Sequence, residues 1–142
     1  MRIFLSVILS SFLCLSANAQ NKELKKVEQI LLRQAKDWNT GKIENFMNGY
    51  WESDQLQFIG SRGVTKGWQK TLDNYKKSYP DKATMGQLSF NILSSEKIGR
   101  KAIMMVGKFT LDRQEKENLS GHFLLIWRKI KGEWVIVADH TS

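Results

Sequence analysis

The sequence predicts an α+β domain in which three helices in the first half of the chain pack on a strongly curved antiparallel sheet formed by the second half. Apolar residues recur at three- and four-residue steps up to Pro80, which is helical spacing. Beyond Gly86 apolar and polar residues alternate, as in strands with one buried face. Two strand-like runs flank a tight Lys131-Gly132 turn, which indicates a hairpin near the end of the chain.

The start of the chain, residues 1–19, has the pattern of a secretory signal peptide. Arg2 supplies a short basic start, an apolar run follows, and Ala17-Asn18-Ala19 is a small-x-small cleavage site. The apolar run is shorter than the roughly 20 residues that a spanning helix needs, so we expect no stable membrane anchor. We therefore expect cleavage after Ala19 and a periplasmic or secreted domain of residues 20–142.

Cys14 is the only cysteine, and it lies in this leader. A lipoprotein acylated at Cys14 is the alternative to a cleaved signal, although Leu13 stands where a small residue is expected before such a cysteine. Once the leader is removed, the domain has no thiol for a disulfide, a catalytic nucleophile or a zinc site. We therefore expect the hydrophobic core alone to hold the domain together.

The chain is basic, with a formal net charge of +8. Basic and acidic residues are interspersed, as in Lys22-Glu23 and Glu115-Lys116-Glu117, whereas nucleic-acid binding needs a basic patch or stripe. We therefore expect a solvated basic surface and no nucleic-acid partner.

Three helices are predicted before Pro80. The first covers residues 21–39, where Asn21 can cap the start, and its apolar stripe comprises Leu24, Val27, Leu31, Ala35 and Trp38. The second covers residues 42–49. The third covers residues 68–79 and ends before Pro80; its stripe is mostly aromatic, which suggests one wall of a cavity, and comprises Trp68, Leu72, Tyr75 and Tyr79.

Strands are predicted mainly in the second half of the chain. A short strand and a glycine-spaced turn precede the third helix, at residues 56–59 and at Gly60, Gly63 and Gly67. The remaining strands cover residues 87–93, 101–111, 121–129 and 133–141. The second of these is apolar on both faces, which places it at the centre of the sheet or in a subunit contact.

Several short motifs accompany this order of elements: Trp38-Asn39-Thr40-Gly41, Phe58-Ile59-Gly60, Gly67-Trp68, Tyr79-Pro80, Met85-Gly86-Gln87-Leu88-Ser89-Phe90 and the closing segment from Trp134 to Ser142. Together they resemble the nuclear transport factor 2-like superfamily and, within it, the SnoaL-like branch of secreted bacterial domains of unknown function. The resemblance covers residues 20–142. It implies a cone-shaped fold, a cavity between helices and sheet, and a homodimer formed through the sheet. Members of the superfamily include isomerases, cyclases and dehydratases as well as proteins that only bind or assemble, so the fold does not select a function.

Strict alternation along the last strand would place Val135, Val137, Asp139 and Thr141 on one face and Trp134, Ile136, Ala138 and His140 on the other. The similar ending of the calcium/calmodulin-dependent kinase association domain implies that the Asp139 face looks into the cavity. His140 and Trp134 then lie on the dimer side or have structural roles. We expect the ligand-binding residues to be Tyr50, Phe58, Trp68, Tyr75, Phe123, Leu125 and Trp127.

Asp139 is the candidate catalytic residue. A carboxyl in an apolar cone would have a raised pKa and could act as an acid or base. The alternative is a structural role in which Asp139 accepts hydrogen bonds from backbone groups or from a tyrosine such as Tyr50 or Tyr75. His122 and His140 lack metal-ligand spacing, and we expect no metal and no cofactor.

Three functions remain open. The first is an exported domain that binds a small apolar ligand in an aromatic pocket. The second is a cofactor-independent isomerase or dehydratase that uses Asp139. The third is a dimeric protein-interaction module. The sequence contains no Gly-x-Ser-x-Gly elbow and no recognisable pair of nucleophile and base, which argues against covalent catalysis.

Overall fold

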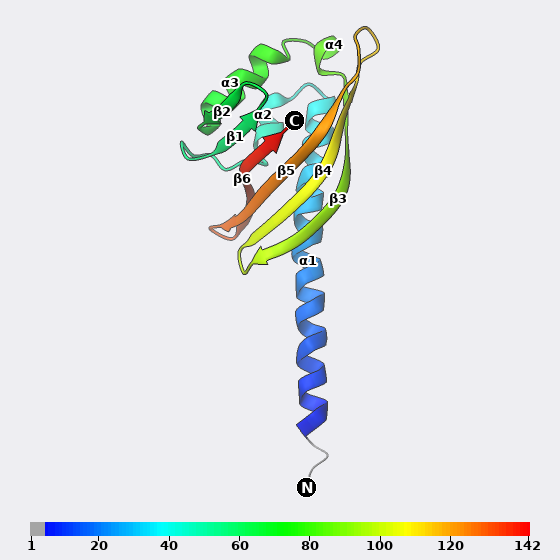
Figure 1. Ribbon diagram of the computed structural model, residues 1–142, viewed down its shortest axis with the longest axis vertical. Coiled ribbons are helices and arrows are strands. Elements are labelled where there is room, and N and C mark those ends of the chain that lie inside the picture. Colours follow the sequence, from blue (N-terminus) through cyan, green and yellow to red (C-terminus); the bar gives the residue numbers. More distant parts are fainter. Residues whose placement is uncertain (1–4) are drawn as a thin grey trace.

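The computed structural model describes residues 5–142, with side chains from residue 21 onward. Helices dominate the first half of this range and long strands the second. The elements are α1 (Leu5–Asn39), α2 (Ile43–Met47), β1 (Gln57–Gly60), β2 (Gly63–Lys66), α3 (Trp68–Ser78), α4 (Lys82–Met85), β3 (Gln87–Gly99), β4 (Ala102–Asp112), β5 (Leu119–Ile130) and β6 (Glu133–Thr141). The predicted α+β class and cone-like arrangement of helices on a curved sheet are confirmed (Figure 1).

The sheet has the strand order β2-β1-β6-β5-β4-β3. All neighbours are antiparallel except β1 and β6, which run parallel, with Phe58 opposite Asp139. The antiparallel sheet that the sequence predicts therefore contains one parallel pair. The β1–β2 hairpin covers the free edge of β6, and a strand that enters beside β6 in the same direction pairs with it in parallel.

Bulges bend the long strands around α1. The register shifts twice between β3 and β4 and once between β5 and β6. Each extra residue bends its strand and increases the local twist. The curved ribbon of β3 to β6 therefore wraps the upper half of α1 (Figure 1).

The core lies between α1 and the concave face of the sheet. Val27, Leu31 and Trp38 are buried on α1, and they face a sheet interior that includes Ile103 and Trp127. Burying each such apolar side chain contributes about 1.5–3 kcal/mol. This packing confirms the helical stripe predicted for the first helix.

Two details of the helices differ from expectation. Asn21 does not cap α1, because the leader continues the same helix from Leu5. The short helix α4 was not predicted; Asp81 caps it by accepting a hydrogen bond from the Thr84 backbone N–H at 2.7 Å, and a four-residue helix is too short to show a hydrophobic period.

The leader's side chains lie outside the described residues. Cleavage after Ala19 and acylation of Cys14 therefore stay predictions. Among the residues that the structure describes, no helix carries a stretch that is both long and apolar enough to span a bilayer.

Candidate functional site

A cavity of about 100 Å³ lies between α1, α3 and the concave face of the sheet. Six of the residues expected at the site line it: Tyr50, Phe58, Tyr75, Phe123, Leu125 and Asp139. Ten further residues line it: Leu31, Gln34, Trp38, Phe46, Tyr79, Leu88, Phe90, Phe109, Leu111 and Thr141. The walls are mainly aromatic and aliphatic, with a few polar groups, a combination found in small-molecule sites.

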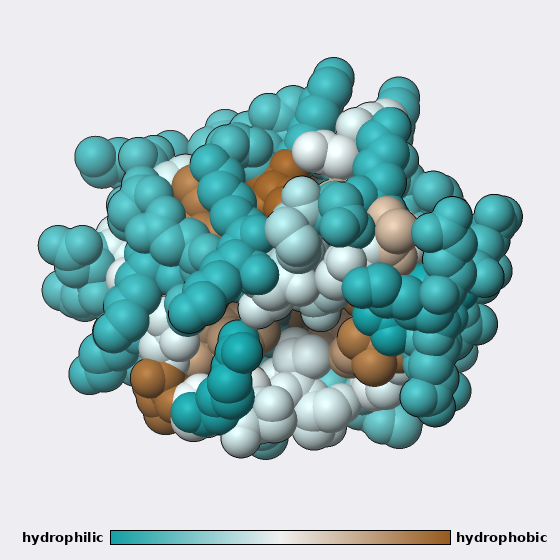
Figure 2. Space-filling model, turned by 90° about the horizontal axis from the view of Figure 1, so that it is seen from above, coloured by the Kyte–Doolittle hydropathy of each residue, from teal (hydrophilic) through white to brown (hydrophobic). Residues whose placement is uncertain are grey.

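A second, outer depression of about 320 Å³ adjoins the cavity. The two share Phe58, Tyr75, Tyr79, Phe109 and Thr141. The outer depression adds polar residues from the β1–β2 hairpin and α3, including Arg62 and Asn74. Figure 2 views the end of the molecule that carries α3 and α4, and it shows a mostly hydrophilic surface with paler and brown residues gathered in a hollow near its middle.

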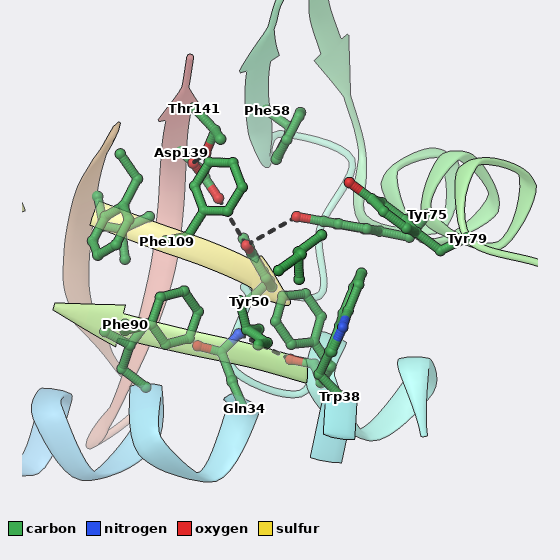
Figure 3. A pocket seen from close by; sticks show the side chains of 16 residues that line it. Gln34, Trp38, Tyr50, Phe58, Tyr75, Tyr79, Phe90, Phe109, Asp139 and Thr141 are labelled. Atoms are coloured by element: carbon green, nitrogen blue, oxygen red, sulfur yellow. Dashed lines mark hydrogen bonds between the residues drawn. The ribbon is translucent and has the colours of Figure 1, made fainter. Parts of the chain in front are cut away.

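The polar centre of the cavity is the carboxyl of Asp139, which is only 3% exposed. The Tyr50 hydroxyl donates to Oδ2 at 2.7 Å, and the Thr141 hydroxyl donates to Oδ1 at 2.6 Å. The Tyr75 hydroxyl lies 3.5 Å from that of Tyr50 (Figure 3). Because the single hydroxyl proton of Tyr50 is donated to Asp139, Tyr75 is the donor in this longer contact. Asp139 thus accepts a hydrogen bond from a predicted partner, Tyr50.

Main-chain pairing fixes Tyr50 against Asp139. Tyr50 forms an isolated parallel bridge with Ile136 on β6. On either side of it, the Ile136 N–H donates to the Gly49 carbonyl at 2.9 Å, and the Trp51 N–H donates to the Ile136 carbonyl at 2.9 Å. The segment that carries Tyr50 is therefore bonded to β6 at Ile136, three residues before Asp139. This pairing holds the Tyr50 hydroxyl close to the Asp139 carboxyl.

Burial dominates the electrostatics of this centre. Loss of solvent raises the pKa of Asp139 above its ordinary value of 3.8, against the opposing effect of the two hydroxyl donors and of nearby His140. Burial and the negative charge of Asp139 likewise raise the pKa of Tyr50 and of Tyr75 well above the ordinary value of 10.0. No ion pair within the described residues involves Asp139. Both tyrosines therefore stay protonated and available as donors.

An aromatic cluster surrounds the Tyr75 ring. Tyr75 packs edge-to-face on Trp38, Phe46 and Phe58 with centroid distances of 5.9, 5.3 and 5.7 Å, and it stacks on Tyr79 at 6.2 Å. Such pairs contribute about 0.5–1.5 kcal/mol each beyond burial. The mutual packing holds the cavity wall in place; of the predicted α3 stripe, Tyr75 and Tyr79 line the cavity and Trp68 and Leu72 do not.

The predicted alternation along β6 is wrong at Trp134 and Ile136. The β5–β6 register pairs Ile126 with Ala138 but Trp127 with Ile136, so Val137 is an extra residue on β6. This bulge shifts the phase, and both residues face inward on the same side of the sheet as Asp139. Trp134 is 5% exposed and donates its indole N–H to the Glu23 carboxylate on α1. His140 is exposed on the opposite face from Asp139, as expected from the alternation beyond the bulge.

The structure places both expected ligand-binding tryptophans, Trp68 and Trp127, outside the cavity. The Trp68 indole donates to the Met47 carbonyl at 3.0 Å. Trp127 is fully buried opposite Ile103 and Ile136, farther along the sheet where α1 fills the concave face. Trp127 is a core residue and Trp68 is partly buried against the core; residue type alone did not distinguish either from cavity residues.

Gln34 is the most informative residue that the sequence analysis missed. The stripe of α1 includes Val27, Leu31, Gln34 and Trp38, with Gln34 at 1% exposure, whereas Ala35 is only partly buried. A polar residue that continues an apolar stripe at the right spacing was the signal available in the sequence. Among the residues whose side chains are described, no group of three or more His, Cys, Asp or Glu is arranged to hold a metal ion.

The fold is similar to that of several solved proteins. A nuclear transport factor 2-like protein of unknown function from Shewanella oneidensis is 39% identical, with a TM-score of 0.79, over 83% of this chain and 97% of that one. A superfamily protein from Salmonella enterica is 18% identical, with a TM-score of 0.66, over 86% and 91%. A ketosteroid isomerase-like protein from Erwinia carotovora is 16% identical, with a TM-score of 0.66, over 86% and 96%. No protein-family model and no curated protein matches the sequence.

The raised pKa of Asp139 predicts a particular pH dependence of stability. The folded state holds the Asp139 proton more tightly than the unfolded chain, so the free energy of unfolding falls as pH rises from 3.8 through the raised pKa. The free energy of unfolding falls in total by about 1.4 kcal/mol for each unit by which the folded-state pKa of Asp139 exceeds its ordinary value. Asp139→Asn removes this contribution. The free energy of unfolding of the wild type minus that of the variant, measured by urea unfolding from pH 3 to 8, should therefore decline with pH and then level off. A difference that increases with pH would mean that the carboxyl is stabilised in its charged form.

Proposed function

This chain belongs to the nuclear transport factor 2-like superfamily, and we propose that it is an exported, SnoaL-like domain that binds a small, largely apolar ring-shaped molecule in the cavity beneath α3. The proposal is supported above all by one observation. A fully buried carboxyl, Asp139, lies with the Tyr50 and Tyr75 hydroxyls in a cavity whose other walls are mainly aromatic and aliphatic. Such a site combines apolar contact area with a few polar groups that orient the ligand.

The dimensions of the site fit a small ring. The inner cavity of about 100 Å³ is comparable to the engineered apolar cavity of roughly 150 Å³ that binds benzene. The adjoining depression of about 320 Å³ offers room for a substituent that extends toward α3 and the β1–β2 hairpin. Edge-to-face packing by the surrounding aromatic rings favours a flat ligand over a branched one.

The second candidate is a cofactor-independent isomerase or dehydratase. Burial raises the pKa of Asp139 above its ordinary value, which makes the carboxyl a stronger base than an exposed one. A solved protein of the same fold is described as ketosteroid isomerase-like. However, the hydrogen bonds from Tyr50 and Thr141 to the two carboxylate oxygens stabilise the charged form of Asp139, which makes it a weaker base than burial alone would. This geometry favours binding over catalysis.

A homodimer through the sheet and export to the periplasm are parts of the same proposal. The outer face of the sheet presents apolar side chains at its centre, among them Met104, Val106, Leu124 and Ile126, and Leu124 is 37% exposed. A contiguous apolar face of this kind is typical of a subunit contact. The protein-interaction alternative would use the same face with a different partner.

Filling the cavity should abolish ligand binding. Leu31 lines the cavity at 3% exposure, and its neighbour Leu32 is 64% exposed on the same helix. Leu31→Phe should weaken binding of small aromatic molecules, measured by calorimetry, at least tenfold, because the added ring atoms occupy the space; the added bulk should cost about 1–3 kcal/mol of stability. Leu32→Phe is the matched control and should bind as wild type does. Equal affinity in both variants would place the ligand elsewhere.

Turnover separates the second candidate from the first. If Asp139 is a catalytic base, wild type should isomerise some member of a panel of enolisable ketones, and Asp139→Asn should lower kcat by at least a hundredfold while ligands still bind. The binding proposal predicts no turnover by either protein, followed spectrophotometrically. Turnover that persists in Asp139→Asn would remove the proposed catalytic role.

A further inference from the structure

Gln34 carries a buried hydrogen-bond acceptor that no described residue satisfies. The side chain lies on α1, is 1% exposed and lines the inner cavity. Its Nε2 donates to the Phe46 carbonyl at 2.9 Å. Its Oε1 is buried without a hydrogen-bond partner among the residues that the structure describes. Buried side-chain oxygens in native proteins nearly always have a partner, so this atom requires an explanation.

The orientation of the Gln34 amide is fixed by its surroundings. The Phe46 carbonyl can only accept a hydrogen bond, so the amide nitrogen must face it and the oxygen must point away. The amide also lies against Gly49, where an added Cβ would be 2.5 Å from Nε2 and 2.8 Å from Oε1. Because Gly49 has no side chain, the Gln34 amide can occupy this position, where the Phe46 carbonyl holds its nitrogen.

We propose that Gln34 determines ligand specificity, and that its Oε1 accepts a hydrogen bond from a hydroxyl or N–H group on the inner end of the bound molecule. The ligand class is therefore flat aromatic molecules with a donor on the ring, such as phenols, indoles and anilines. This inference rests on the proposed binding function and narrows it. An apolar ring without a donor would leave the Gln34 oxygen desolvated and unpaired.

The position of Gln34 relative to the other polar groups supports this class. Gln34 projects from α1, whereas Asp139 and Thr141 project from β6, with Tyr50 between them (Figure 3). The rings beside Gln34 include Trp38 and Phe46, which pack edge-to-face with centroids 5.2 Å apart. A flat ring in this cavity can therefore place one polar substituent at Gln34 and direct another toward the Tyr75 hydroxyl.

An ordered water is the competing occupant. A buried water typically makes two to four hydrogen bonds. The indole N–H of Trp38, the nearest aromatic donor on the same helix, is already donated to the Met85 carbonyl at 3.2 Å. A water at Gln34 would have few other polar partners, so a ligand donor is the better match.

The test compares two ligands of nearly equal size, p-cresol and p-xylene, by calorimetry. Wild type should bind p-cresol about tenfold or more tightly, because only p-cresol carries a donor for Oε1. In Gln34→Met, which keeps length and volume, the preference should disappear. Gln29→Met, at an exposed position on the same helix, is the control and should keep it. Gly49→Ala should also reduce the preference, because the new Cβ displaces the Gln34 amide.

The outcomes separate this inference from the proposed function. Equal affinities of the wild-type protein for p-cresol and p-xylene would show that both rings bind but that neither donates a hydrogen bond to Oε1. This result would overturn the role of Gln34 and leave the binding function intact. A cresol preference that survives in folded Gln34→Met would assign the donor to the Asp139 side and also overturn it. Binding of neither ring would contradict both proposals. The ligand comparison in wild type decides the question even if a variant fails to fold.

Discussion

The arrangement of the site depends on one requirement, that the Asp139 carboxyl be satisfied inside an apolar cavity. A buried polar group without partners costs several kcal/mol, and a charged one costs more. Tyr50 and Thr141 supply one hydroxyl to each carboxylate oxygen. Tyr50 can do so because the chain on either side of it is bonded to Ile136, three residues before Asp139. The main-chain bonds to Ile136 and the Tyr50–Asp139 hydrogen bond thus together hold the segment after α2 against β6.

The aromatic rings that surround this contact give the cavity its shape. Tyr75 on α3 touches rings from α1, α2 and β1, so a shift of α3 would disturb several pairs at once. Mutually packed rings resist collapse, which explains how an apolar cavity persists in a chain of this size. Gln34 and the Asp139 group then provide polar contacts from two different walls of one space. A binding site with few, fixed polar groups follows from the packing of the fold itself.

The fold and six of the sixteen residues that line the cavity could be predicted from local patterns and from the family resemblance. Helical stripes located α1 and α3, and alternation placed Asp139 and His140 on opposite faces. The similar ending of the association domain then indicated that the Asp139 face looks inward. The failures involve information that is not local. The bulge at Val137 brought Trp134 into the core, and the parallel pairing of β1 depends on where the chain enters beside β6. Gln34 was missed because an apolar stripe favours the apolar Ala35 over the polar Gln34, although both lie three or four residues from Leu31 and from Trp38.

The most direct test of this account is a carbon-13 NMR titration of the Asp139 side-chain carboxyl, assigned by its loss in Asp139→Asn. A carboxyl that is buried in the cavity and held by two hydroxyl donors should titrate above 3.8, because burial outweighs the donors. Replacing one donor, as in Tyr50→Phe, should raise the midpoint further. A midpoint at or below 3.8 in the wild-type protein would mean that the carboxyl is exposed to solvent or paired with a cation, and would contradict the account.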